Sequence, residues 1–183
     1  MSANTFPAQL EPFKWAEQGF SWSGRLPLTR FPRIASEAAS SDSSLGVQVD
    51  CRLFLDERRF ARLQASLVTT VPLTCQRCLE AVDATIDTDV DLVLLSDAKY
   101  AERLDEDADF VILSEEQVVH GEADSDLIDL LALLEDELLL SLPLAPRHDH
   151  CDYAVPVVEI EDEPAERDNP FSVLASLKQR LDS

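Results

Sequence analysis

Apolar and polar residues alternate along three stretches of the sequence, at residues 47–55, 63–73 and 82–94. Because a period of two places every second side chain on one face of a β-strand, each stretch predicts a strand with one buried face. A short polar segment joins the second stretch to the third, which predicts a hairpin. The residues expected to face the core are Val47, Val49, Cys51, Leu53 and Leu55, then Leu63, Ala65, Leu67, Thr69, Val71 and Leu73, then Val82, Ala84, Ile86, Thr88, Val90, Leu92 and Leu94.

Weaker patterns surround these three strands. Residues 1–17 show no clear periodicity. Proline has no backbone N–H to donate, so Pro32 interrupts any helix in its region. The remaining predicted elements are a short strand at 19–28, a short interrupted helix at 29–40, an acidic loop at 96–109, another short strand at 110–113 and a turn at Gly121.

A leucine-rich stretch between Asp124 and Leu142 follows the period of a helix instead. Asp124, Ser125 and Asp126 are all favourable N-cap residues, and Pro143 requires the helix to end by Leu142. At roughly 100° per residue, one helix face collects most of the leucines and is expected to pack on the sheet. These leucines are Leu127, Leu130, Leu131, Leu134, Leu138 and Leu142.

Two leucines of this helix fall outside that face. Leu133 and Leu140 lie one heptad apart among acidic residues. An apolar centre with a charged rim is the usual layout of a protein-binding patch, so this stripe predicts a site for a basic partner. The alternative is that Phe171, Leu174 and Leu177 of the C-terminal segment fold back and cover the two leucines. The predicted partner-binding residues are Asp129, Leu133, Asp136, Glu137 and Leu140.

Acidic residues are concentrated in the last two thirds of the chain. The formal net charge is −21, and residues 63–183 carry 29 Asp and Glu against seven Lys and Arg. Such a surface repels nucleic-acid phosphates and attracts basic proteins, so we expect a basic protein partner and only indirect contact with RNA. With no membrane-spanning run, we expect a cytoplasmic protein that does not enter a membrane. The alternative is direct RNA binding through the N-terminal arginines Arg25, Arg30, Arg33, Arg52, Arg58, Arg59 and Arg62.

Four residues carry the pattern of a metal site. Cys75 and Cys78 have the spacing with which a tight hairpin presents two thiolates to one ion, and His148 and Cys151 repeat that spacing after the leucine-rich helix. Together they can surround a zinc ion tetrahedrally, and a closed four-ligand site is structural. The alternatives are reduced thiols packed at a loop contact, and thiol redox catalysis, which a Cys-x-x-Cys between two strands fits poorly. Cys51 faces the core and is not expected to be a ligand.

Together the patterns predict an α+β fold. We expect a single domain at 1–151, built from an antiparallel sheet or a small open β-barrel with the leucine-rich acidic helix packed on it. Residues 152–183 are expected to form an acidic flexible tail that ends in a short helix at about 169–181, where Asn169 and Pro170 provide a start signal. The carboxylates are dispersed and the sequence has no phosphate-binding glycine loop or Gly-x-Ser-x-Gly element, so no catalytic residues are expected.

Three blocks in sequence, at residues 73–78 (LTCQRC), 128–143 and 169–178, resemble the YceD family of bacterial large-ribosomal-RNA-subunit accumulation proteins. The resemblance implies a non-enzymatic factor needed for accumulation of 23S ribosomal RNA, acting in synthesis, processing or assembly of the large subunit. Its partner would then be a basic protein of the large ribosomal subunit or an enzyme that processes or modifies ribosomal RNA. Some members of the family carry further cysteines after the helix, where this sequence has His148 and Cys151.

Overall fold

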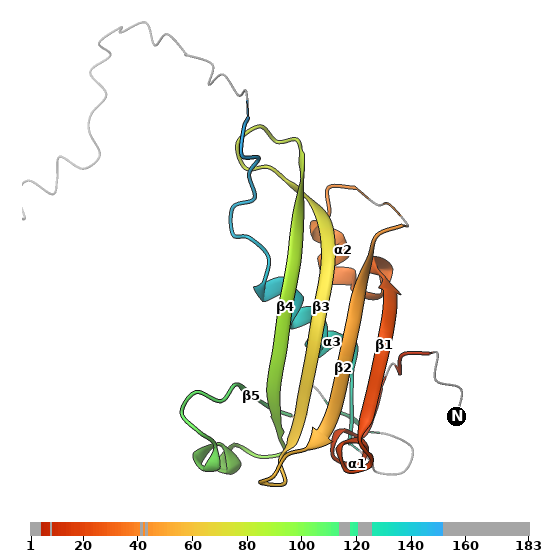
Figure 1. Cartoon of the computed structure of the whole chain (residues 1–183), viewed down its shortest axis with the longest axis vertical. Coiled ribbons are helices and arrows are strands. Elements are labelled where there is room, and N and C mark those ends of the chain that lie inside the picture. The colour runs from red at the N-terminus through yellow and green to blue at the C-terminus, as the bar shows by residue number, and fades with distance from the viewer. Residues whose placement is uncertain are drawn as a thin grey trace, which may run out of the picture. The chain divides into compact units, whose positions relative to one another are not determined.

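A five-stranded open sheet forms the frame of the molecule, in the order β1-β2-β3-β4-β5 (Figure 1). The computed structural model describes residues 5–7, 9–40, 42, 44–113, 118–120 and 126–151. Neighbouring strands from β1 to β4 run antiparallel, whereas β5 pairs parallel with β4. The predicted α+β class with an antiparallel open sheet is therefore confirmed, with one parallel strand at an edge. The strands are β1 (Phe20–Pro27), β2 (Gly46–Leu55), β3 (Ala61–Thr74), β4 (Ala81–Leu95) and β5 (Phe110–Ile112).

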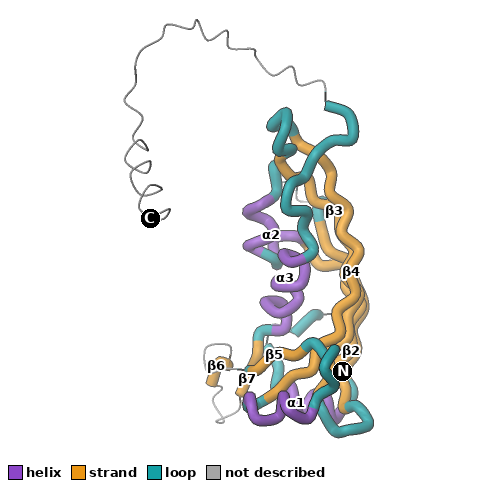
Figure 2. The backbone as a smooth tube through the Cα atoms, turned by 90° about the vertical axis from the view of Figure 1, so that its left-hand side faces the viewer, coloured by secondary structure: helices purple, strands orange, loops and turns teal. Residues whose placement is uncertain are grey.

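Helices lie on one face of this sheet, which we call the inner face, and the opposite face is the outer face (Figure 2). The helices are α1 (Pro12–Gln18), α2 (Pro32–Glu37) and α3 (Leu130–Leu140), with short 3-10 helices η1 (Leu28–Arg30) and η2 (Ala98–Arg103). A separate two-stranded ribbon consists of β6 (Val118–His120) and β7 (Asp126–Ile128). Within the described residues, no helix combines the length and the apolar content that a membrane crossing requires.

The core lies between the inner face and the helices, and it follows the alternation of the sequence. In β3 every second residue from Ala61 to Leu73 is buried, and β2 and the second half of β4 keep the predicted phase. Thr69 is the one polar residue among the buried residues of β3, and its hydroxyl donates to the carbonyl of Gly46 at 3.2 Å. Because that hydrogen bond replaces the one lost to water, Thr69 can occupy a core position.

The predicted start of the leucine-rich helix is wrong. Helix α3 begins at Leu130, and Asp129 is its N-cap, with a side-chain oxygen that accepts from the Ala132 N–H at 3.1 Å. The three preceding residues form β7, and Ile128 exchanges two backbone hydrogen bonds with Leu10 at 2.9 and 3.1 Å. Since tertiary partners hold that backbone extended, Leu127 belongs to a strand. The helix ends before Pro143, as predicted.

The predicted stripe on α3 is wrong for Leu133, which belongs to the core. Its side chain is 6% exposed, whereas that of Leu140 is 80% exposed. The two leucines share a helix face, but seven residues separate them by about 10 Å along the axis. The first half of α3 is packed against the core around most of its circumference, with Leu130, Leu131, Leu133 and Leu134 all buried. Burial therefore changes along the helix as well as around it.

Replacing these two leucines separately is expected to give very different results. Leu133→Ala should lower the free energy of unfolding by about 2–4 kcal/mol, because it leaves a cavity in the core. Leu140→Ser changes an exposed side chain and should alter stability by less than about 0.5 kcal/mol. Urea denaturation of both variants measures the difference. A Leu133→Ala variant as stable as Leu140→Ser would restore the predicted stripe.

Several weaker predictions can also be compared with the structure. The strands at 19–28 and 110–113 are confirmed as β1 and β5. The helix predicted at 29–40 is shorter, because η1 ends at Arg30 and Pro32 begins α2 instead of interrupting it. Helix α1 was not predicted, although Pro12 at its first position and Gly19 in the left-handed conformation after its end are good start and stop signals. Gly121, the tail at 152–183 and its helix at 169–181 lie outside the described residues, so these remain predictions.

Candidate metal centre

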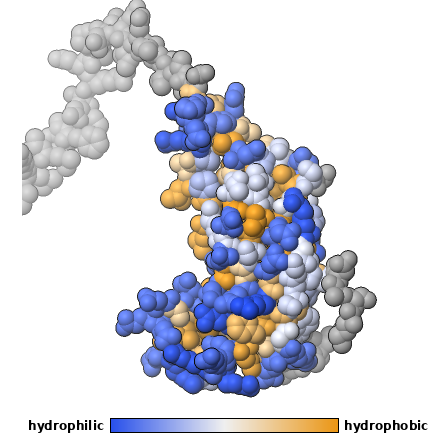
Figure 3. All heavy atoms as spheres, viewed as in Figure 1, coloured by the Kyte–Doolittle hydropathy of each residue, from blue (hydrophilic) through white to orange (hydrophobic). Residues whose placement is uncertain are grey.

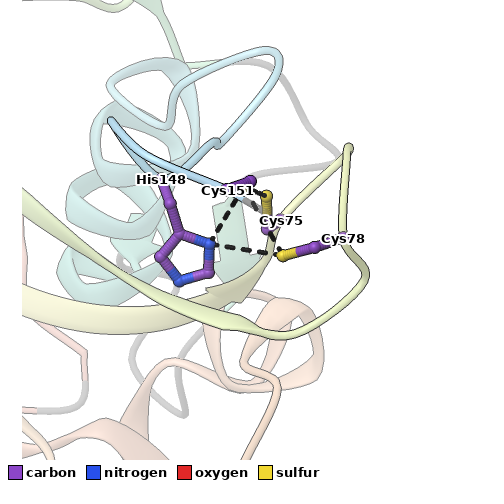
Figure 4. A group of neighbouring side chains, drawn as sticks. All are labelled: Cys75, Cys78, His148 and Cys151. Atoms are coloured by element: carbon purple, nitrogen blue, oxygen red, sulfur yellow. Dashed lines mark hydrogen bonds between the residues drawn. The ribbon is translucent and has the colours of Figure 1, made fainter. Parts of the chain in front are cut away.

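The turn between β3 and β4 presents two cysteines on the same side (Figure 4). Cys75 continues the ladder, with its N–H donating to the carbonyl of Glu80 at 2.8 Å. Leu79 closes the turn with a positive φ of 63°, and its N–H donates to the carbonyl of Cys75 at 3.0 Å. The chain reverses so tightly that the thiols of Cys75 and Cys78 approach the same point.

The loop after α3 docks on this turn and brings the other two candidate ligands. The Gln76 N–H donates to the carbonyl of Pro146 at 2.8 Å, which ties the loop to the turn. His148 Nε2 lies 2.9 Å from the carbonyl oxygen of Ala81. A carbonyl can only accept, so this contact assigns the ring proton to Nε2 and leaves Nδ1 free to bind a metal. Figure 4 shows Nδ1 directed toward the thiols.

The four ligand atoms have the separations that tetrahedral coordination requires. Cys151 Sγ lies 3.5 Å from Cys75 Sγ and 3.6 Å from Cys78 Sγ, and His148 Nδ1 lies 3.4 and 3.5 Å from the sulfurs of Cys78 and Cys151. With metal–sulfur bonds of about 2.3 Å and metal–nitrogen bonds of about 2.1 Å, tetrahedral ligand atoms lie roughly 3.6–3.8 Å apart. The thiols are free, and these separations are far longer than a disulfide bond. The cluster therefore fits a metal ion.

Hydrogen bonds around the cluster favour thiolates, which are the metal-binding form of cysteine. The backbone N–H of Cys78 is the main cause of a lowered Cys75 pKa of about 5, and those of Arg77 and His148 contribute. Desolvation alone would raise the pKa of Cys151, but hydrogen bonds, chiefly the one from the Arg77 side chain, lower it. Hydrogen bonds to Cys151 and Cys75 raise the pKa of His148. The pKa of Cys78 is raised. A hydrogen bond from the Glu80 N–H lowers it, but desolvation and the neighbouring thiols of Cys75 and Cys151 raise it by more.

The structure thus brings together all four predicted ligands, Cys75, Cys78, His148 and Cys151, within 4.8 Å of one another. Metal binding itself remains a prediction. Cys51 lies in the core at 6% exposure, as predicted, and burial raises its pKa to about 11.

The predicted partner stripe does not form one continuous surface. Besides the buried Leu133, Asp129 caps its own helix and Asp136 accepts from Arg33 Nη1 at 2.6 Å. Glu137 is half-buried, and desolvation raises its pKa, with smaller contributions from Asp109 and Asp136. Of the two leucines in the stripe, only Leu140 is exposed.

Sequence reasoning gave no role to Glu135, which is only 4% exposed on α3. Its carboxylate accepts from the backbone N–H groups of Arg33 and Ile34 in α2, at 2.7 and 3.2 Å, and from Arg33 Nε at 2.9 Å. The available signal was an acidic residue next to Leu134, inside the leucine-rich face. Its partner Arg33 lies about a hundred positions away, which no local pattern reveals.

Comparison with known proteins places the chain in a family. The model of the family "Large ribosomal RNA subunit accumulation protein YceD" matches residues 63–178, which include all four residues of the cluster. A protein of that name from Haemophilus influenzae is 28% identical over 179 residues, covering 95% of this chain and 97% of the relative. No solved structure matches the chain. Because the family model spans more than half of the sequence, the chain belongs to the YceD family of large ribosomal RNA subunit accumulation proteins.

Proposed function

We propose that the chain is a non-enzymatic adaptor in the biogenesis of the large ribosomal subunit, needed for the accumulation of 23S ribosomal RNA. The family name supports a role in accumulation of the large-subunit RNA. The adaptor binds a basic protein of the large subunit or an enzyme that processes or modifies its RNA. A formal net charge of −21 attracts such partners and repels free RNA.

One observation supports the adaptor mechanism over direct RNA binding. Several arginines that could contact RNA are already bound to other side chains of the same chain. Arg33 binds Glu135 and Asp136, and Arg62 binds Asp91 through Nε and Nη2. The other two engaged arginines are Arg58, which pairs with Asp105 at 3.0 Å, and Arg52, which donates to the side chain of Gln64. Four of the seven arginines that direct RNA binding would use are therefore already engaged by acidic or amide side chains.

We also propose that the cysteine–histidine cluster holds one zinc ion with a structural role. Thiolate and imidazole ligands suit zinc, and four protein ligands leave no open position for a substrate. Three thiolates and a neutral imidazole give the zinc site a net charge of −1, which the Arg77 guanidinium beside Cys151 offsets. The ion would fasten the loop after α3 to the β3–β4 turn. Cys75 is fully buried in that turn, which does not suit a redox nucleophile.

The adaptor and the direct RNA binder differ in their salt dependence and in their need for a second protein. We expect capture of tagged full-length protein from cells to recover a basic protein at both low and moderate salt, with ribosomal RNA lost after nuclease treatment. The purified chain alone should show little affinity for 23S ribosomal RNA fragments at about 150 mM salt. Binding through six or more phosphates would instead fall by about 10³-fold between 50 and 200 mM salt.

Direct RNA binding, the alternative to the adaptor mechanism, can be tested with two charge-reversing substitutions. Arg58, Arg59 and Arg103 line one hollow of about 250 Å³ with Phe60 and Tyr100. If the purified chain binds ribosomal RNA tightly, and Arg58→Glu with Arg59→Glu abolishes this binding, the adaptor mechanism is wrong and that hollow is the RNA site.

A further inference from the structure

One edge of β4 has no strand partner over most of its length within the described residues. The edge of β4 that faces β3 is paired with it along its length. Among the described residues, the opposite edge is paired only with β5, and only at Val93–Leu95. In an antiparallel pair, successive residues direct their N–H and C=O groups alternately toward the partner strand and away from it. The carbonyl of Ala81 faces His148, and the carbonyl of Leu95 accepts from the Leu113 N–H, so the odd-numbered residues of β4 point away from β3.

Five residues therefore form what we call the open edge of β4: Asp83, Thr85, Asp87, Asp89 and Asp91. No hydrogen bond within the described part of the chain reaches their main-chain groups on the side away from β3. Figure 1 shows β4 without a neighbouring strand between its start and β5. A row of unpaired N–H and C=O groups is a template for an additional strand.

The side chains of the open edge give this template a strong charge. All five lie on the outer face and are exposed, and four of them are aspartates. Figure 3 shows the outer face, which is covered largely by hydrophilic and weakly polar residues. Beside the edge, Asp89 and Asp91 line a hollow of about 570 Å³ that crosses four strands, with small serines such as Ser23 and Ser66 in its lining. Asp50 adds a further carboxylate to that hollow and Arg52 adds one guanidinium, which donates to the side chain of Gln64.

We propose that the open edge of β4 is the docking site for an extended basic segment of a partner protein, which joins the sheet as an additional strand. Main-chain hydrogen bonds supply the pairing. Lysine or arginine at every second position places the cations on the outer face, opposite the aspartates, where cross-strand pairs of opposite charge are favourable. A long basic side chain opposite Asp89 reaches into the hollow, whereas Asp91 is already paired with Arg62. This proposal rests on the adaptor function and names the surface that performs it.

Charge also selects among the possible occupants. A second copy of the chain paired edge to edge would bring aspartates opposite aspartates, which is unfavourable. Residues 152–168 of this chain carry seven Asp and Glu against one Arg, so they meet the same repulsion. An extended basic segment of another protein avoids both costs.

The probes for a test are two synthetic ten-residue peptides of identical composition, five lysines and five threonines. In one the lysines alternate with threonines, so that an extended strand carries all its charge on one face. In the other the lysines form one block. We expect the alternating peptide to bind the full-length protein at least tenfold more tightly. We also expect it to slow the amide exchange of residues 83–91 in the wild-type chain.

Thr85 offers a matched pair of variants on the open edge. Thr85→Pro removes one N–H that points away from β3 and leaves the β3–β4 ladder and the charge unchanged. Thr85→Val removes the same hydroxyl but keeps the N–H. Thr85→Pro should weaken binding of the alternating peptide by roughly tenfold. Thr85→Val should bind like wild type, with an unchanged melting temperature as the check on folding.

Three outcomes would overturn the docking proposal. The first is equal binding of both peptides with no effect of Thr85→Pro, which means that the acidic surface attracts cations without strand pairing. The second is slow exchange of the residue 85 and 87 amides before any peptide is added, which means that the chain covers its own edge. The third, applicable even if Thr85→Pro does not fold, is peptide binding that leaves exchange at 83–91 unchanged. None of these affects capture of a basic protein from cells, so the adaptor function is tested separately.

Discussion

Under the zinc proposal, Cys75→Ser is expected to abolish metal binding and to lower the free energy of unfolding by at least about 4 kcal/mol, a loss that few ordinary substitutions reach. For a chain of this length, that corresponds to a melting temperature roughly 8–16 °C lower. Cys75 is fully buried, and its thiolate accepts hydrogen bonds from the backbone N–H groups of Cys78, Arg77 and His148. Serine neither replaces the thiolate as a ligand nor satisfies those donors equally well. The binding free energy of a structural metal is folding free energy, so both losses appear as lowered stability.

Cys51→Ala is the matched control, because Cys51 is the one cysteine outside the cluster. This variant can lose stability through its core cavity, but it should keep about one zinc per chain. Elemental analysis of proteins purified without chelator measures the metal, and thermal unfolding measures the stability. Wild-type protein that contains no metal, with four freely titrating thiols, would contradict the zinc proposal.

The hairpin and its cysteine–histidine cluster could be predicted because local rules determine them. Along β3 and the first part of β4 the same period of two is maintained, so the phase of burial and the position of the turn followed directly. The period ends at Leu92–Leu95, where both faces of β4 are buried. The two pairs of ligands share one spacing, and each pair lies on a short loop. Only the docking of the second loop on the turn required tertiary information, which the bond between Gln76 and Pro146 now provides.

The errors occurred where tertiary contacts override a local pattern. Asp124, Ser125 and Asp126 are all suitable N-caps, but pairing of Ile128 with Leu10 keeps the chain extended until Asp129. The burial of Leu133 depends on its depth along α3, which a helical wheel does not describe. The same limit explains why periodicity could not assign Glu135, whose partners come from α2.

Glu135 acts as an N-terminal cap supplied to α2 by another helix. Helix α2 starts at Pro32, and its own N-cap residue, Phe31, makes no side-chain capping bond. The Glu135 carboxylate accepts from the N–H groups of Arg33 and Ile34, which belong to the first turn of α2. These N–H groups have no acceptor within the helix, and a negative charge is favourable at this end of the helix dipole. Glu135 therefore joins α2 to α3 at a buried position.

Glu135→Ala is accordingly expected to lower the free energy of unfolding by about 2–4 kcal/mol, because two backbone donors and the Arg33 guanidinium lose a shared acceptor in a buried place. Glu135→Gln keeps the size and one acceptor oxygen, so its loss should be intermediate. Asp136→Ala is the matched control: it removes the other acid that pairs with Arg33, but both side chains of that pair are 48% exposed. An exposed pair contributes at most about 1 kcal/mol, so this variant should remain close to wild type. Urea denaturation compares the three variants. If Asp136→Ala proves as destabilising as Glu135→Ala, charge pairing with Arg33 is responsible and the capping of α2 is not.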